Sequence, residues 1–214
     1  MTDNDTVPTS KKTPTDAQAP AQAQARRAEL LATAAEVFAA HGYNATTVRR
    51  IAERAGLLAG SLYYHFDSKE AMLDEILSGF LDELWARYEA VLTAGHSPRG
   101  TVEALVTESF REIDRHRAAV AVYQREAGHL AALPRFAYLA DSGRRFEEMW
   151  LAVLRRGVAD GAFRADLDVR LAYRFLRDTV WVAASWYRPG GTHSPEEIAR
   201  QYLSMVLDGI AVRA

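Results

Sequence analysis

Residues 26–70 read RRAELLATAAEVFAAHGYNATTVRRIAERAGLLAGSLYYHFDSKE. Apolar residues in the first part of this stretch recur with the spacing of an α-helix, at Leu30, Leu31, Ala34, Val37 and Phe38. Gly42 follows them closely, and glycine is the residue that most often ends a helix. The stretch therefore opens with one amphipathic helix that stops at about His41.

Two shorter helices are expected next. Thr46 or Thr47 can cap the first of them, which covers TVRRIAERA at residues 47–55. Gly56 then fits a tight turn, because glycine adopts a positive φ at little cost. The second short helix covers about residues 59–66. Two helices joined by a glycine turn and braced by a preceding helix form a helix-turn-helix motif, whose second helix enters the major groove of DNA.

This second short helix and its surroundings predict a DNA-binding surface. The residues expected to face the groove are mostly small or apolar: Leu58, Ala59, Gly60, Ser61 and Tyr63. The residues expected to anchor phosphates carry hydroxyl, imidazole or cationic groups: Thr47, Arg49, Tyr64, His65 and Lys69. Ser61 can hydrogen-bond a base edge or a phosphate, and Leu58 and Ala59 can contact thymine methyl groups.

Net charge is a weaker indication of DNA binding than the helix-turn-helix pattern. The chain has 26 Lys and Arg against 28 Asp and Glu, a formal net charge of −2, so a DNA-binding surface must be a local patch. Residues 26–70 carry six basic and five acidic side chains. Arg49, Arg50 and Arg54 fit DNA contacts, and they fit equally well an ordinary solvated helix face paired with Glu53. The order of cap, turn and aromatic-rich helix favours DNA binding.

Residues 34–73 closely resemble the N-terminal domain of TetR-family transcriptional repressors. The resemblance lies in the spacing of Phe38, Gly42, Thr46 and Thr47, in the pairs Ile51-Ala52 and Ala55-Gly56, and in Gly60-Ser61-Leu62-Tyr63-Tyr64-His65-Phe66 followed by Lys69. It implies a homodimer that binds a palindromic operator on double-stranded DNA, with recognition helices roughly 34–36 Å apart. Leu58 and Ala59 stand where the family often has serine and a basic residue, so the half-site sequence is not predictable.

Outside this head we expect a tail and a long helical body. Residues 1–23 are polar and poor in large apolar residues, which predicts a disordered tail. Residues 24–70 form the helix-turn-helix domain, with the motif at about 47–66, and residues 71–214 form a ligand-binding and dimerisation domain. With the three helices of the head, the expected all-α, TetR-type fold has nine helices, those of the body covering about 69–92, 101–116, 120–133, 136–160, 167–187 and 194–212.

The last two predicted helices carry more apolar surface than a monomer would expose. Their apolar stripes comprise Leu171, Phe175, Val182, Trp186, Ile198, Tyr202, Met205, Val206 and Ile210. The family resemblance implies that they form an intersubunit four-helix bundle. The alternative is that both stripes close the core of a monomer.

A ligand site is expected in the body. Arg177 lies within an otherwise apolar helix, four residues before Trp181 and on the same face. Asp178 is expected to pair with Arg174, which leaves the Arg177 guanidinium for an anionic ligand. Two alternatives are simpler: the aromatic residues are core, and Arg177 is a rim residue with its stem packed on apolar surface.

The body also resembles the actinobacterial TetR-type repressors of late cholesterol-ring catabolism. The segments VYQREAGHLAALP and GVADGAFRADLDVRLAYRFLRDTVWVAASWYRPGG, at residues 122–134 and 157–191, carry this resemblance. It implies an effector that is a coenzyme A thioester of a steroid-ring fragment, bound near the dimer interface. The residues expected to hold it are Arg177 and Trp181, with Tyr123, Arg125, Trp150 and Arg188 as further candidates.

Nothing in the sequence indicates an enzyme, a metal centre or a cofactor. There is no cysteine, the six histidines lack metal-ligand spacing, and no nucleophile-elbow or phosphate-loop motif occurs. No apolar run approaches the roughly 20 residues that span a bilayer, so we expect a cytoplasmic protein without a membrane partner. Two alternatives stay open: a regulator of this fold that senses a fatty acyl-CoA or a drug, and an architectural DNA-binding protein, which the low net charge disfavours.

Overall fold

The computed structural model of the chain describes residues 18–210, with side chains from residue 21 to residue 208. Nine α-helices and a short 3-10 helix make up this described part, which confirms the predicted all-α fold. Their bounds are α1 Gln18–His41, α2 Val48–Arg54, α3 Ala59–Leu62, α4 Lys69–Thr93, α5 Pro98–Leu130, the 3-10 helix Pro134–Phe136, α6 Tyr138–Ala159, α7 Val169–Trp181, α8 Ala183–Trp186 and α9 Pro195–Ile210.

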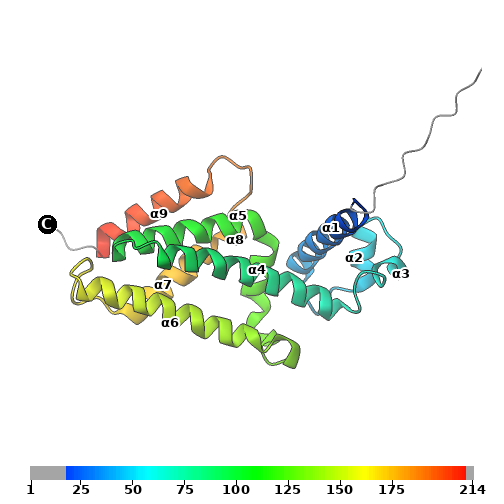
Figure 1. Cartoon of the computed structure of the whole chain (residues 1–214), viewed down its shortest axis with the longest axis horizontal. Coiled ribbons are helices and arrows are strands. Elements are labelled where there is room, and N and C mark those ends of the chain that lie inside the picture. The colour runs from blue at the N-terminus through cyan, green and yellow to red at the C-terminus, as the bar shows by residue number, and fades with distance from the viewer. Residues whose placement is uncertain (1–17, 211–214) are drawn as a thin grey trace, which may run out of the picture.

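The helices form an elongated molecule with a small head at one end (Figure 1). Helices α1, α2 and α3 make the head, and α4 runs from it into the body formed by α5 to α9. Helix α5 is central, because it contacts α1, α4, α6, α7, α8 and α9. One continuous hydrophobic core extends from Leu30 in α1 to Leu207 in α9. None of the described helices combines the length and hydropathy needed to cross a bilayer.

Side-chain caps begin several helices, and the cap of α2 is the predicted Thr47. The hydroxyl groups of Thr47, Ser68 and Ser194 each accept a hydrogen bond from the backbone N–H three residues later, at 3.2, 3.0 and 3.2 Å. At α9 the Glu197 carboxylate also accepts from the Ser194 N–H at 2.9 Å. This reciprocal pair is a capping box, which fixes the start of α9 and so the apolar face that the helix presents.

Two helix boundaries in the body differ from the predictions. The expected helices at 101–116 and 120–133 are one helix, α5, with a break at His116, where φ is −125° and ψ is 33°. The expected helix at 167–187 is divided into α7 and α8 at Val182. No glycine or proline in the sequence marks either change. Side-chain contacts surround the break at His116, and α8 is only one turn long.

The ends of the chain and the third helix also differ. Helix α1 already begins at Gln18, inside the expected tail, whose residues 1–17 lie outside the described part. Helix α3 ends at Leu62, and the next three residues form a turn rather than a continuation to Phe66. The predicted end of the last helix at Val212 lies outside the described residues.

Candidate functional site

The head has the frame of a helix-turn-helix. Ile51 and Ala52 of α2 and Leu62 of α3 are buried against the rest of the head. Gly56 joins the two helices with a φ of +68°, a conformation that favours glycine. These contacts fix α3 by one face, so its opposite face is turned toward solvent.

The outward face of α3 and its flanks is apolar and aromatic. Leu58 is 81% exposed, Tyr64 is 90% exposed, and Tyr63 is also largely outside the core. Gly60 is exposed, and a Cβ added there would meet nothing within 4 Å. Isolated apolar groups do occur on protein surfaces, but this group sits on the helix that a helix-turn-helix inserts into DNA. Leu58 precedes α3 without a side-chain cap, as the sequence indicates.

The predicted phosphate-anchoring residues lie in different surroundings. Thr47 and Arg49 are exposed at the start of α2, where Arg49 pairs with Glu53. Lys69 is held within the head: its Nζ donates to the backbone oxygens of Tyr43 at 3.0 Å and Thr46 at 3.1 Å. Lys69 therefore fastens the turn between α1 and α2 to the start of α4. Ala59, Ser61 and His65 are partly buried beside the exposed residues of α3.

Arg27 is a structural residue that the sequence did not single out for any role. Its guanidinium forms a two-point ion pair with Glu75 of α4, at 3.0 and 2.5 Å, and lies 4.2 Å from the centre of the Phe66 ring. It also donates to the backbone oxygen of His65. Arg27 thus connects α1 to α4 and to the segment that follows α3, next to the exposed Tyr63 and Tyr64. The sequence shows only that Arg26 and Arg27 form a basic pair near the start of the first predicted helix, and it does not show their partners.

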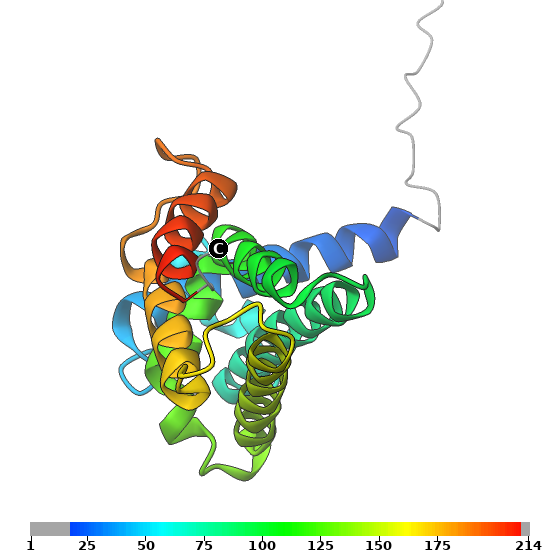
Figure 2. The same ribbon diagram turned by 90° about the vertical axis from the view of Figure 1, so that its left-hand side faces the viewer.

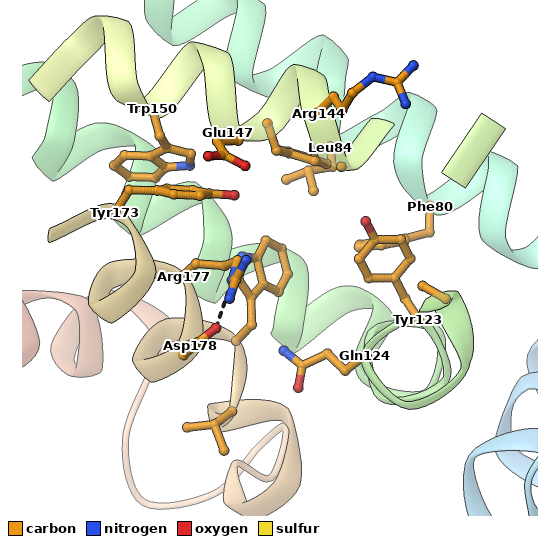
Figure 3. A pocket seen from close by; sticks show the side chains of 15 residues that line it. Phe80, Leu84, Tyr123, Gln124, Arg144, Glu147, Trp150, Tyr173, Arg177 and Asp178 are labelled. Atoms are coloured by element: carbon orange, nitrogen blue, oxygen red, sulfur yellow. Dashed lines mark hydrogen bonds and ion pairs between the residues drawn. The ribbon is translucent and has the colours of Figure 1, made fainter. Parts of the chain in front are cut away.

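The body contains a cavity of about 670 Å³ between α4, α5, α6 and α7 (Figure 3). This volume is within the range of roughly 300–1,000 Å³ that is usual for small-molecule sites. Most of the lining is apolar or aromatic, with a few charged side chains. The lining residues are Phe80, Leu84, Tyr123, Gln124, Ala127, Gly143, Arg144, Phe146, Glu147, Trp150, Tyr173, Arg177, Asp178, Trp181 and Val182.

Aromatic rings form much of the cavity wall. The Phe80 ring centre lies 5.9 Å from that of Tyr123 and 6.2 Å from that of Trp181. Trp150 is buried, and in Figure 3 its ring lies beside that of Tyr173. Burial raises the pKa of the Tyr123 hydroxyl, so this group stays neutral at ordinary pH. The wall therefore suits a flat apolar group.

Arg177 lies at the cavity, but its partner is not the expected one. Its Nε donates to Asp178 Oδ1 at 2.7 Å, and the guanidinium lies 5.6 Å from the centre of the Tyr173 ring (Figure 3). The hydrogen bond to Asp178 raises the pKa of Arg177. The expected pairing of Asp178 with Arg174 was wrong because the long arginine side chain folds back along α7 to its neighbour. Arg177 is also half-exposed rather than buried, so its charge is accessible from the cavity or from solvent.

The predicted ligand residues divide into two groups. Tyr123, Trp150, Arg177 and Trp181 all line the cavity. Arg125 and Arg188 are not brought to it: Arg125 binds backbone oxygens of α1, and Arg188 lies in the turn after α8. Sequence reasoning missed the cavity residues of α4 and several of α5 and α6, because their spacing is that of ordinary core and surface positions; they include Phe80, Leu84, Gln124, Ala127, Gly143, Arg144 and Glu147.

A cluster of ionisable side chains holds the break in α5. His116 Nε2 lies 2.9 Å from Glu83 Oε2 and 3.7 Å from Oε2 of the fully buried Glu112. Two carboxylates and an imidazole are possible metal ligands, and these atoms lie within 4.8 Å of one another. Arg87 and Arg115 pair with the same two carboxylates, so their charges are already compensated. We assign the cluster to holding α4 against α5.

A second exposed apolar surface covers α7, α8 and α9. These helices lie along one side of the molecule, coloured orange and red in Figure 2, and the hydroxyls of Thr179 and Tyr202 join α7 to α9 at 2.7 Å. Its exposed members are Leu171, Phe175, Val182, Trp186 and Met205. Ile198, Tyr202 and Val206 are partly buried, and the side chain of Ile210 lies outside the described part. Val182 belongs both to this surface and to the cavity lining.

A helix-turn-helix head on a helical body with a ligand-sized cavity defines a DNA-binding transcriptional regulator. Two family models match the chain: the tetR family of bacterial regulatory proteins over residues 30–76, and the tetracyclin repressor-like C-terminal domain over residues 95–210. The chain belongs to the TetR family of transcriptional regulators. These matches support a regulator rather than an enzyme.

Its relatives include proteins named HTH-type transcriptional repressor KstR2. The one from Rhodococcus jostii is 57% identical over 87% of this chain and 91% of its own length. The solved structure of the ketosteroid transcriptional regulator KstR2 of Mycobacterium tuberculosis is 50% identical and covers 88% of this chain and 96% of that one, with a TM-score of 0.85. AibR, solved in complex with isovaleryl coenzyme A and operator DNA, is 19% identical over 84% of this chain and 97% of its own, with a TM-score of 0.68, and shares the fold alone.

Proposed function

We propose that this protein is a homodimeric repressor that binds a palindromic operator and releases it when an acyl-CoA thioester occupies the cavity. The acyl group we favour is a steroid-ring fragment. The proposal is supported by the relatives named as KstR2 repressors, one of them described as a ketosteroid transcriptional regulator. A fatty acyl-CoA or a drug is the alternative effector.

The observation that carries the effector proposal is the position of Arg177. Apolar rings line the cavity around Phe80, Tyr123 and Trp181, and the half-exposed Arg177 lines it beside them. Arg144 also lines this cavity. A thioester of a ring acid has the matching polarity, because its fused rings are apolar and the phosphates of coenzyme A are anionic. Guanidinium groups bind phosphates with two parallel hydrogen bonds.

DNA binding and effector binding are then linked through the dimer. Val182 lines the cavity and also lies on the exposed apolar surface of α7 to α9, which we assign to the partner subunit. A ligand in the cavity can therefore change how two subunits meet, and with it the separation of their heads. By linkage, DNA must weaken effector binding by the same factor as the effector weakens DNA binding.

The test is operator release measured by fluorescence anisotropy on DNA from the protein's own upstream region. Steroid-ring thioesters, fatty acyl-CoA, free acids and coenzyme A alone are compared. We expect release by the ring thioester only. Arg177→Ala should keep operator affinity and lose release, whereas Arg155→Ala, an exposed arginine of α6 outside the cavity lining, should behave as wild type. Normal release from the Arg177 variant would exclude this residue as the effector contact.

A further inference from the structure

The second half of α5 carries residues that face in two directions. Tyr123, Gln124 and Ala127 line the cavity. Between them, Arg125 and Glu126 reach the head, where they contact the end of α1. Residues separated by one or two positions on a helix point to different sides, so a single short segment is in contact with both parts of the molecule.

Arg125 closes the C-terminal end of α1. Its Nη2 donates to the backbone oxygen of Phe38 at 2.6 Å and its Nη1 to that of Ala39 at 3.1 Å. Both oxygens belong to the last four residues of α1, where carbonyls run out of helical partners, and that of Phe38 also accepts from the Gly42 N–H just beyond the helix at 2.8 Å. A cation at this end also interacts favourably with the helix dipole. Arg125 therefore supplies α1 with a cap that comes from the body.

Glu126 continues the contact into the turn after α1. Its Oε1 accepts from the Tyr43 N–H at 3.3 Å and from Arg125 Nε at 3.1 Å, and its side chain is only 13% exposed. Gly42 has a φ of +82°, and a Cβ there would lie 3.2 Å from Glu126 Oε1. The turn is thus shaped to admit this carboxylate.

The same turn is held from its other side by α4. The Tyr43 hydroxyl donates to Glu70 at 2.6 Å, and Lys69 donates to the Tyr43 backbone oxygen. The turn after α1 is therefore held in place by both α4 and the second half of α5. Because α5 is broken at His116, this second half does not continue the axis of the first half.

We propose that Arg125 and Glu126 are positioning residues that tie the head to the cavity-lining half of α5. When an effector displaces this half-helix through Tyr123 and Gln124, the tie moves the end of α1 and with it the DNA-binding surface. The inference rests on the proposed function only in requiring that some effector enters the cavity. Arg125 then contributes to the response without contacting the ligand.

The principal test is Arg125→Ala against Arg99→Ala. Arg99 is a suitable control because it lies on the same helix, its side chain is 44% exposed against 45% for Arg125, and it pairs with Glu103 within α5. Operator affinity is measured with and without a saturating steroid-ring thioester, and thioester affinity is measured separately by tryptophan fluorescence. Effectors of this kind typically change DNA affinity by about 5- to 150-fold.

We expect Arg125→Ala to reduce this ratio to within about twofold of one while thioester affinity changes by less than about threefold. Arg99→Ala should keep the wild-type ratio. Arg125→Lys should also lose most of the ratio, because an ammonium group cannot reproduce the fork that spans two carbonyls and Glu126. A wild-type ratio in both Arg125 variants, or an equal loss in Arg99→Ala, would overturn the proposal.

A second measurement needs no effector. The Gly42 N–H bonds to the Phe38 oxygen at 2.8 Å, next to the Arg125 contact, so hydrogen exchange at this amide reports on the tie. Exchange should be faster in Arg125→Ala and in Glu126→Gln than in wild type or Arg99→Ala. Unchanged exchange would show that Arg125 and Glu126 do not stabilise the end of α1. If no thioester releases wild type from DNA, the effector proposal fails while this measurement still decides on the tie.

Discussion

The apolar surface of α7 to α9 gives the sharpest prediction, and Phe175 is its most informative residue. This side chain lies on α7 and is 62% exposed, although three other residues of the same helix, Tyr173, Leu176 and Val180, are buried. Phe175 belongs to an exposed apolar surface with Leu171, Val182, Trp186 and Met205, and an extended surface of this kind marks an interaction site. If two subunits meet here, replacing Phe175 with alanine should weaken the dimer.

The size of the effect follows from the exposed area. A phenylalanine offers roughly 200 Å², so 62% exposure leaves roughly 120 Å² for a partner to cover. At about 25 cal/mol per Å² this is worth about 3 kcal/mol in each subunit, of which alanine keeps about a third. A two-fold interface uses the residue twice. Phe175→Ala should therefore weaken dimerisation by up to about 4 kcal/mol, or roughly 10³-fold in the dissociation constant.

Sedimentation equilibrium over a concentration series measures this constant directly. Leu133→Ala is the matched control, because Leu133 is also an exposed apolar residue but lies in the loop between α5 and α6, far from α9 in Figure 1. The control should dimerise as wild type does. A monomeric wild-type protein at micromolar concentration, or a Phe175 variant that dissociates no more readily than Leu133→Ala, would refute the assignment of this surface.

Two further predictions concern stability. In α6, Gly157→Ala should lower the free energy of unfolding by about 1–3 kcal/mol, because the new Cβ would overlap the Phe163 ring; Gly79→Ala in α4, where the Cβ meets nothing within 4 Å, should be neutral or stabilise, and equal thermal shifts would contradict this. The Tyr187 hydroxyl donates to Asp114 at 2.6 Å. Burial is the main cause that raises the pKa of Tyr187 from 10.0 to about 12, and this hydrogen bond is the second. The neutral hydroxyl therefore stabilises the folded protein fully below pH 10, and this contribution is lost as the pH rises toward 12. Urea unfolding should therefore show the deficit of Tyr187→Phe shrinking above pH 10, and a constant deficit would exclude this cause.

The head could be predicted from sequence because its determinants are local. Thr47 and Ser68 cap the helices that follow them, and Gly56 makes the turn, all within three residues of what they control. The exposure of Leu58 and Tyr64 follows once α3 is fixed by its buried side. The contacts that orient the head were not predicted. Arg27 pairs with a carboxylate 48 residues away, and no local pattern encodes that distance.

The cavity was predictable only in part for the same reason. Tyr123, Trp150, Arg177 and Trp181 were found because they are chemically conspicuous on their own helices. Phe80 was missed, since an apolar residue at helical spacing in α4 has the pattern of ordinary core. Whether such a residue faces a cavity depends on how closely the neighbouring helices approach, which is set by long-range packing.

Helix α7 shows why periodicity alone could not separate core, cavity and subunit interface. One side of it is buried, with Leu176; a second lines the cavity, with Arg177; and a third exposes Phe175. Helix α7 carries charged residues as well as apolar ones, but aromatic residues lie on each of these three sides, so its periodicity does not distinguish core from cavity or subunit interface. Because α7 contributes to the core, the cavity and the exposed apolar surface at once, it has a central part in our proposal. A ligand that displaces the backbone of α7 at Arg177 also displaces Phe175, which lies two residues earlier on the same helix.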